Sequence, residues 1–171
     1  MLTLIIIVVI AVLLIAMYFS CNNKEVALRK EAEAQEKAIA SVRDTMWKTI
    51  KEKAGVSEKY RETFEKIYPE IIAGRYQQEG SSTFKMIHES NPEFDTSLYQ
   101  ELMQTIECQR AAFNNAQKRM LDIIRERDTL LETMPQKFFI SNKSKIEYKP
   151  IVSDATNEVI RTHVDNDMLE L

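Results

Sequence analysis

The stretch "TSLYQELMQTIECQRAAFNNAQKRMLDIIRERDTLLETM", residues 96–134, contains the longest regular pattern in the chain and decides its fold. Mostly apolar residues recur in it at alternating spacings of three and four, which place them on one face of an α-helix. These positions are Tyr99, Leu102, Ile106, Gln109, Phe113, Ala116, Met120, Ile123, Arg127, Leu130 and Met134. The pattern predicts one helix about 55 Å long, and such a helix is stable in water only when its stripe packs against other helices.

Two polar residues, Gln109 and Arg127, interrupt this stripe. Either they fix the register of the helix against its neighbour, or their long side chains extend outward to water. We favour the outward orientation for both.

A matching stripe lies in residues 24–55, at Leu28, Ala32, Gln35, Ile39, Val42 and Met46. Nothing in residues 24–54 breaks a helix, so we expect it to continue from the preceding apolar segment and to end at Gly55. Trp47 is expected in the core.

The chain has only three Gly and four Pro, which also favours helix. The prediction is an all-α fold in which long helices form an antiparallel bundle, with a membrane-spanning helix before it.

The segment between the two stripes predicts shorter helices. Ser57 is expected to cap a helix with Tyr60, Phe64, Ile67 and Ile71 on one face, and Pro69 either kinks this helix or divides it. After a loop, a short helix carrying Phe84 and Ile87 should end near Asn91. The predicted domains are therefore an anchor at 1–20, a helical bundle at 21–135, and an irregular, partly mobile tail at 136–171 with one short helix or hairpin.

The first nineteen residues carry no charge, and Leu2–Phe19 has the length of a membrane span, since eighteen helical residues cover about 27 Å. The alternative is a secretory signal peptide. We favour an uncleaved anchor because the apolar run is longer than a usual signal-peptide core and no Lys or Arg precedes it.

Cys21 follows the apolar run in "MYFSCNNK", residues 17–24. Lipidation is disfavoured by the bulky Tyr18 and Phe19 just before it, and a bridge to the distant Cys108 by the short Cα separation that a disulfide needs. We expect both cysteines to be reduced, with Cys21 a small residue at the water interface and Cys108 on the helix surface or in the bundle.

The composition predicts no catalytic, cofactor-binding or metal-binding residues. The net charge is −3, which gives no basic field for nucleic acid. His88 and His163, the two histidines, stand far apart without cysteine partners, and Asp165, Asp167 and Glu170 lack the spacing of a calcium loop. Glycine-rich phosphate loops and nucleophile motifs are absent from the sequence.

Several segments resemble the LemA family of membrane-anchored helical proteins. "NPEF" at 91–94 looks like the turn that introduces the family's last long helix, and Tyr99, Leu102 and Ile106 fall at the spacing of its Phe, Leu and Leu/Ile. "TMP", ending at Pro135, looks like its closing Phe-Pro, and "KIYPEII" at 66–72 is similar to its Ile-Pro segment. The resemblance covers roughly residues 1–140.

The chain departs from the LemA pattern where the family has two Tyr-Asn pairs, since it has Met120-Leu121 and Arg127-Asp128 there, and it lacks the Arg-Arg before the Ile-Pro segment. The resemblance implies a membrane helix followed by a helical bundle. It implies no catalytic residues, because the family has none that are agreed.

The expected function is a noncatalytic, membrane-tethered scaffold of the LemA type that binds an unidentified protein partner. Association with a second copy of the chain is a further alternative, because a heptad stripe packs within or between chains. Lys24, Arg29 and Lys30 follow the span, so the positive-inside rule predicts a single-pass inner-membrane protein with its N-terminus outside and its body in the cytoplasm. The alternative is a phage or envelope coiled-coil factor, spanin-like, with its body outside the inner membrane. A membrane hydrolase is a third, less favoured hypothesis.

Overall fold

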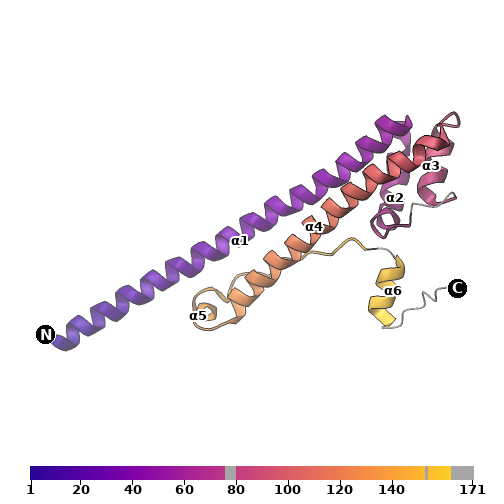
Figure 1. The fold of residues 1–171 in the computed structure, drawn as a ribbon. Helices are drawn as coiled ribbons and strands as arrows, with labels where there is room; N and C mark the ends of the chain where they lie inside the picture. The colour runs from indigo at the N-terminus through magenta and orange to yellow at the C-terminus, as the bar shows by residue number, and fades with distance from the viewer. Residues whose placement is uncertain (76–79, 153, 163–171) are drawn as a thin grey trace. The chain divides into compact units, whose positions relative to one another are not determined.

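The computed structural model describes residues 1–75, 80–152 and 154–162, and over these residues the chain is all-α, as predicted, without a β-strand (Figure 1). The main helices are α1 (Leu2–Ala54), α2 (Arg61–Ile72), α3 (Ser82–Ser90) and α4 (Tyr99–Glu132). Two short helices follow, α5 (Gln136–Ile140) and α6 (Asp154–Thr162). Single 3₁₀ turns, Glu58–Tyr60 and Thr96–Leu98, precede α2 and α4.

Helix α1 is unbroken over 53 residues, which confirms that the apolar segment continues into the following stripe. Its apolar N-terminal part is long and apolar enough to cross a membrane, and none of it is buried in the protein. The helix ends where predicted, because Gly55 adopts a φ of +65°, a left-handed conformation that glycine takes without steric cost. Asn91 Nδ2 donates to the Ala54 carbonyl at 3.0 Å, which satisfies one of the free carbonyls at the helix end.

The residues form two compact units, and α1 and α4 contribute to both. Unit 1 contains residues 1–38 and 116–148. Unit 2 contains residues 39–115 and the chain after residue 148.

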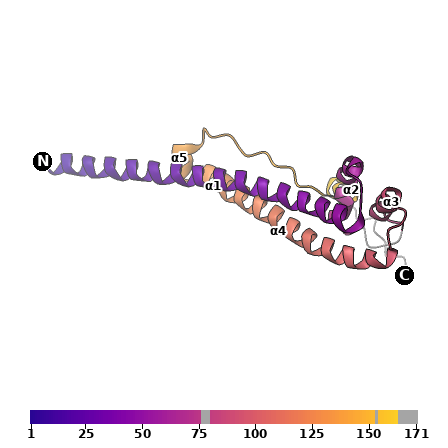
Figure 2. The ribbon, with the colours of Figure 1, turned by 90° about the horizontal axis from the view of Figure 1, so that it is seen from above.

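In unit 1, α1 and α4 lie side by side and antiparallel (Figure 2). Lys24 pairs with Glu126, whereas Gln35 Nε2, further along α1, donates to the Ala116 carbonyl, earlier in α4, at 2.9 Å. Stripe residues of both helices pack against each other in this contact. The buried apolar residues among them are Leu28, Ala32, Met120, Ile123 and Leu130. The predicted stripes therefore make the antiparallel contact.

Unit 2 has a core of aromatic side chains from α1, α2 and α4. Trp47 packs on Phe64 with ring centroids 5.3 Å apart, Phe64 on Tyr68 at 5.5 Å, and Tyr68 edge-on to Phe113 at 5.4 Å. All four are almost fully buried, so the expectation that Trp47 belongs to the core is confirmed. Buried aromatic residues of this size dominate the stability of a small core.

Several local predictions need correction. Ser57 makes no side-chain cap; instead its backbone N–H donates to Ser90 Oγ at 2.8 Å. Pro69 lies inside α2 and does not divide it. Met134 lies beyond the end of α4 and is 73% exposed, so it does not belong to the stripe. The acidic end of the predicted mobile tail, residues 163–171, lies outside the described residues.

Candidate functional site

The most unusual feature of unit 1 is a buried ion pair between α1 and α4, just beyond the apolar segment. Arg127 Nη2 lies 2.6 Å and Nε 3.1 Å from Glu25 Oε1. Glu25 is 1% exposed and Arg127 2%. Removing either side chain should destabilise the fold, because the other would be left in the interior without its counter-charge.

The orientation predicted for Arg127 is therefore wrong. Its side chain turns into the helix contact because a partner of opposite charge occupies the facing position, a relationship that the spacing within one helix does not reveal. Arg127 Nη1 is buried without a hydrogen-bond partner among the described residues. Because the pair is incompletely satisfied, we expect it to affect the register of the two helices more than their stability.

Gln109, the other polar stripe residue, is half-buried in unit 2. Its Nε2 donates to Thr49 Oγ1 on α1 at 2.7 Å, so it also turns toward a neighbouring helix and not outward to water. Both interruptions of the stripe are thus used to join α1 and α4.

Cys21 also belongs to the helix contact. It is 7% exposed, so the expected position at the water interface is wrong. Cys21 and Glu25 extend the α1 stripe backward at the same spacing of four and three that begins at Leu28. That extension is the signal by which Glu25 could have been found. Cys108 is exposed, and neither cysteine forms a disulfide.

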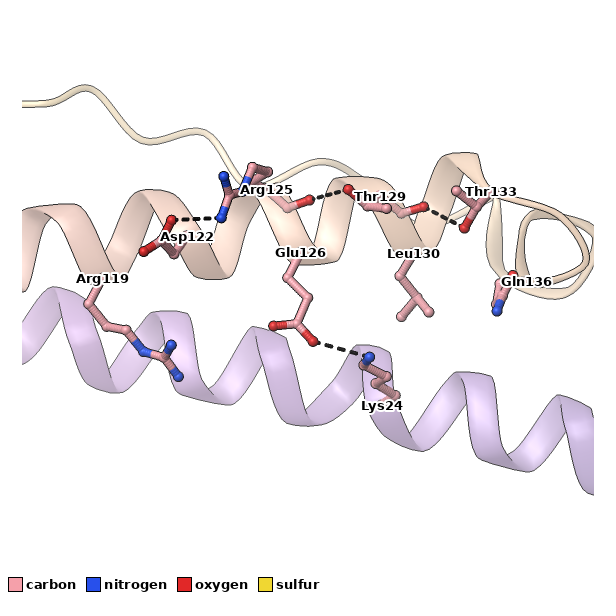
Figure 3. A pocket seen from close by; sticks show the side chains of 9 residues that line it. All are labelled: Lys24, Arg119, Asp122, Arg125, Glu126, Thr129, Leu130, Thr133 and Gln136. Atoms are coloured by element: carbon pink, nitrogen blue, oxygen red, sulfur yellow. Dashed lines mark hydrogen bonds and ion pairs between the residues drawn. The ribbon is translucent and has the colours of Figure 1, made fainter.

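An open groove of about 570 Å³ lies along the α1–α4 contact in unit 1 (Figure 3). Nine residues line it: Lys24, Arg119, Asp122, Arg125, Glu126, Thr129, Leu130, Thr133 and Gln136. Lys24 Nζ lies 3.1 Å from Glu126 Oε1 across the two helices. The hydroxyls of Thr129 and Thr133 each donate to the backbone carbonyl four residues earlier at 2.8 Å.

Each cation of this groove lies beside an acid. Besides the Lys24 pair, Arg125 Nη2 is 3.0 Å from Asp122 Oδ1, and Arg119 pairs with Glu31 on α1. These side chains are largely exposed, and surface ion pairs contribute only about 0–1 kcal/mol each. The groove is therefore a self-paired polar surface.

Within unit 1, the segment after α4 packs back on α4. Tyr148 Oη donates to Gln117 Oε1 at 3.2 Å, and burial raises the pKa of the Tyr148 hydroxyl. Lys145 Nζ lies 2.6 Å from Glu132 Oε1 on α4, and this hydrogen bond lowers the pKa of Glu132. Both contacts hold the extended chain along α4.

At the other end of this segment, α5 carries apolar side chains beside the end of the apolar run. The ring of Phe139 lies edge-on to that of Tyr18, with centroids 6.2 Å apart. Met134 and Phe138 are 73% and 81% exposed. Sequence reasoning missed this surface, because a helix of five residues leaves no periodic pattern.

Of the remaining residues considered in the sequence, only His88 lies in the described part of the chain. His88 stacks on Phe84 with ring centroids 6.1 Å apart, while His163, Asp165, Asp167 and Glu170 lie outside the described residues. Within the described part of the chain, no three His, Cys, Asp or Glu side chains are grouped to hold a metal ion.

Comparisons of the chain with protein-family models, with curated proteins and with solved structures found no match.

Proposed function

We propose that the chain is a noncatalytic scaffold, tethered to a membrane by the apolar part of α1, whose paired helices present a surface to another protein. The observation that carries this proposal is the continuity of α1. The apolar stretch, none of it buried, runs without a break into the segment that packs against α4. A continuous helix passes the orientation of the anchor on to the segment that follows, which a flexible linker does not do.

Binding, as opposed to catalysis, is supported by the way the charges of unit 1 are used. Catalytic groups are typically found in clefts with a strongly perturbed pKa. In the groove the cations are paired with Asp122, Glu126 and Glu31, and the buried Arg127 is paired with Glu25. Such pairs suit a surface of fixed shape and charge pattern, which a protein partner recognises by complementary charges.

The proposed location is the inner membrane, with the N-terminus outside and the body in the cytoplasm. Lys24, Arg29 and Lys30 directly follow the apolar run, and basic residues beside a span are retained on the cytoplasmic side. A membrane helix followed by further helices is also the architecture that the LemA resemblance implies, and membership of that family is part of the proposal.

The orientation test uses the two cysteines, since Cys108 is exposed and Cys21 buried. Cells are treated with a membrane-impermeant maleimide before and after opening, with Cys108→Ser as the control. Labelling of Cys108 only after opening supports the cytoplasmic scaffold. Labelling when only the outer envelope is permeabilised contradicts it and favours the alternative, a spanin-like envelope coiled-coil factor.

The scaffold function itself is tested by crosslinking in membranes followed by mass spectrometry. Crosslinks from Lys24 or Lys118 of unit 1 to one recurring protein are expected, and they should be lost when the groove charges are reversed in Asp122→Lys with Arg125→Glu. Crosslinks that are unchanged by this double reversal, or that reach no recurring protein, would contradict the proposal.

A further inference from the structure

The surface formed by Met134, Phe138 and Phe139, here called the α5 apolar surface, is not explained by the packing of unit 1. Phe138 and Met134 are among the most exposed large apolar residues outside the apolar run of α1. In contrast, Ile140 at the end of α5 is fully buried. One side of α5 is thus fixed to the protein while the other presents apolar side chains outward.

The position of this surface along α1 is defined by contacts within unit 1. Phe139 meets Tyr18 edge-on at 6.2 Å, and Tyr18 meets Phe19 at 5.6 Å. Tyr18 and Phe19 are the last residues of the apolar run, and they are 44% and 57% exposed. Figure 2 shows α5 alongside α1 in unit 1. The α5 apolar surface therefore continues the bare surface of the run at its C-terminal end.

The charges around α5 suit the headgroup region of a bilayer. Residues 136–148 contain three lysines, Lys137, Lys143 and Lys145, and one acid, Glu147. All three lysines are exposed, and among the described residues only Lys145 lies in an ion pair, with Glu132. Aromatic residues at the level of the headgroups with basic residues beside them are typical of membrane–water interfaces.

We infer that the α5 apolar surface is a second membrane contact, in which Met134 and Phe138 enter the headgroup–acyl boundary of the leaflet from which α1 emerges. The inference rests on the proposed anchoring of α1 in a membrane. The lipid bilayer is the occupant because the surface is continuous with the run that the bilayer would cover. A span alone leaves α1 free to rotate about its axis, and a second contact beside it restricts that rotation.

The test places a fluorescent probe on this surface in the full-length chain, reconstituted in phosphatidylcholine–phosphatidylglycerol vesicles. Phe138→Trp adds an indole at a highly exposed site. The only tryptophan of the wild-type chain is Trp47, so the wild-type emission is subtracted from that of the variant. Lipids brominated near the headgroup end or near the acyl terminus quench the indole according to its depth. We expect shallow bromines to lower the Phe138→Trp emission by about twofold or more, since interfacial side chains lie only about 5–10 Å into the bilayer.

The matched control is Leu121→Trp, another exposed apolar residue of unit 1. Arg119 pairs with Glu31. Because α1 and α4 are antiparallel, Leu121 lies level with a point on α1 about two residues before Glu31. That point is about 15 Å along the axis of α1 from Phe19. Its emission should not respond to bromine at either depth. Equal quenching of the two variants would overturn the inference, because it would reflect contact that is not specific to α5.

Flotation of the same samples separates the two hypotheses. If the chain floats with the vesicles but Phe138→Trp is not quenched, the α5 contact is wrong and the anchor stands. An unquenched emission shifted to the blue would show that protein, such as a second copy, covers the surface, which also overturns the inference. If the chain does not float, the proposed membrane anchoring by α1 is wrong, and the inferred α5 contact is wrong as well.

Discussion

Arg127 Nη2 donates to Glu25 Oε1 across 2.6 Å, joining two residues that are 102 positions apart in the sequence and both almost fully shielded from water. The pair lies six residues beyond the end of the apolar run, in the contact between α1 and α4. It aligns the two helices at the point where the body begins, since a shift of either helix would leave both charges buried without a counter-charge.

Breaking this pair should destabilise unit 1 strongly. We expect Arg127→Met to lower the free energy of unfolding by about 3–5 kcal/mol, because Glu25 would stay buried without the partner that satisfies its carboxylate. The double variant Glu25→Leu with Arg127→Met should recover most of that loss, since it replaces the pair with apolar side chains. Urea denaturation of the detergent-solubilised chain measures both changes.

The exposed pair Lys24–Glu126 is the matched control for that experiment, because it joins the same two helices with side chains that are half exposed. Lys24→Met should change the free energy of unfolding by about 0–1 kcal/mol. If Glu25→Leu with Arg127→Met is as unstable as Arg127→Met alone, the loss of stability is not caused by the unpaired Glu25.

The sequence predicted the helices and most of the residues that join them. Alternation of three and four places Leu102, Ile106 and Phe113 on one face whatever the partner helix, so their burial follows from spacing alone. The register between two helices does not, because a repeating stripe packs in several registers. Glu25 opposite Arg127 selects one of them, and that choice appears only once the two helices are placed together.

The site was less predictable than the fold for a related reason. Cys21 and Glu25 follow an apolar run, and in sequence they have the composition expected of a water interface. Their burial depends on the C-terminal part of α4 covering them, a contact between residues about a hundred positions apart. The exposure of Phe138 likewise depends on α4 ending at Glu132, after which the chain turns back.

The aromatic core of unit 2 should depend on Phe64. This side chain is fully buried and its ring contacts those of Trp47 and Tyr68. We expect Phe64→Ala to reduce the free energy of unfolding by about 3–5 kcal/mol, through lost burial and the cavity left behind. Trp47 emission should shift to the red at the same time. Phe138→Ala, at an exposed phenylalanine, is the control, and a comparable loss there would argue that the effect is not due to burial.

Stability should fall in acid partly through Asp44. The side chain of Arg61 donates to Asp44 Oδ1 at 2.5 Å and lowers the pKa of this carboxyl below its ordinary value of 3.8. A lowered pKa in the folded state means that the unfolded chain binds more protons, so the stabilisation is present above about pH 4 and is lost as the pH falls through the folded pKa. Because Asp44 is more than half exposed, the contribution should stay within about 1 kcal/mol.

The measurement is the denaturation midpoint between neutral and acidic pH, followed by the emission of Trp47, since the Arg61 guanidinium lies 5.6 Å from its ring. Asp44→Asn should lower the midpoint at neutral pH and leave it nearly unchanged in acid. Glu33→Gln is the matched control, at an exposed carboxylate without an ion pair among the described residues. If Asp44→Asn has the same effect at both ends of the range, the Arg61 contact does not stabilise the fold through charge.

The two thiols should report separately on the surface and on the α1–α4 contact. Cys108 is exposed, whereas Cys21 is 7% exposed in the layer next to Glu25. In the solubilised chain a thiol reagent should therefore modify Cys108 rapidly and Cys21 only after denaturant is added, since access to a buried thiol requires the helices to open. In Arg127→Met the slow reaction of Cys21 should accelerate, while that of Cys108, in unit 2, should not. Rapid modification of both thiols in the wild-type chain would mean that α4 does not cover this part of α1, and the buried ion pair would then be wrong as well.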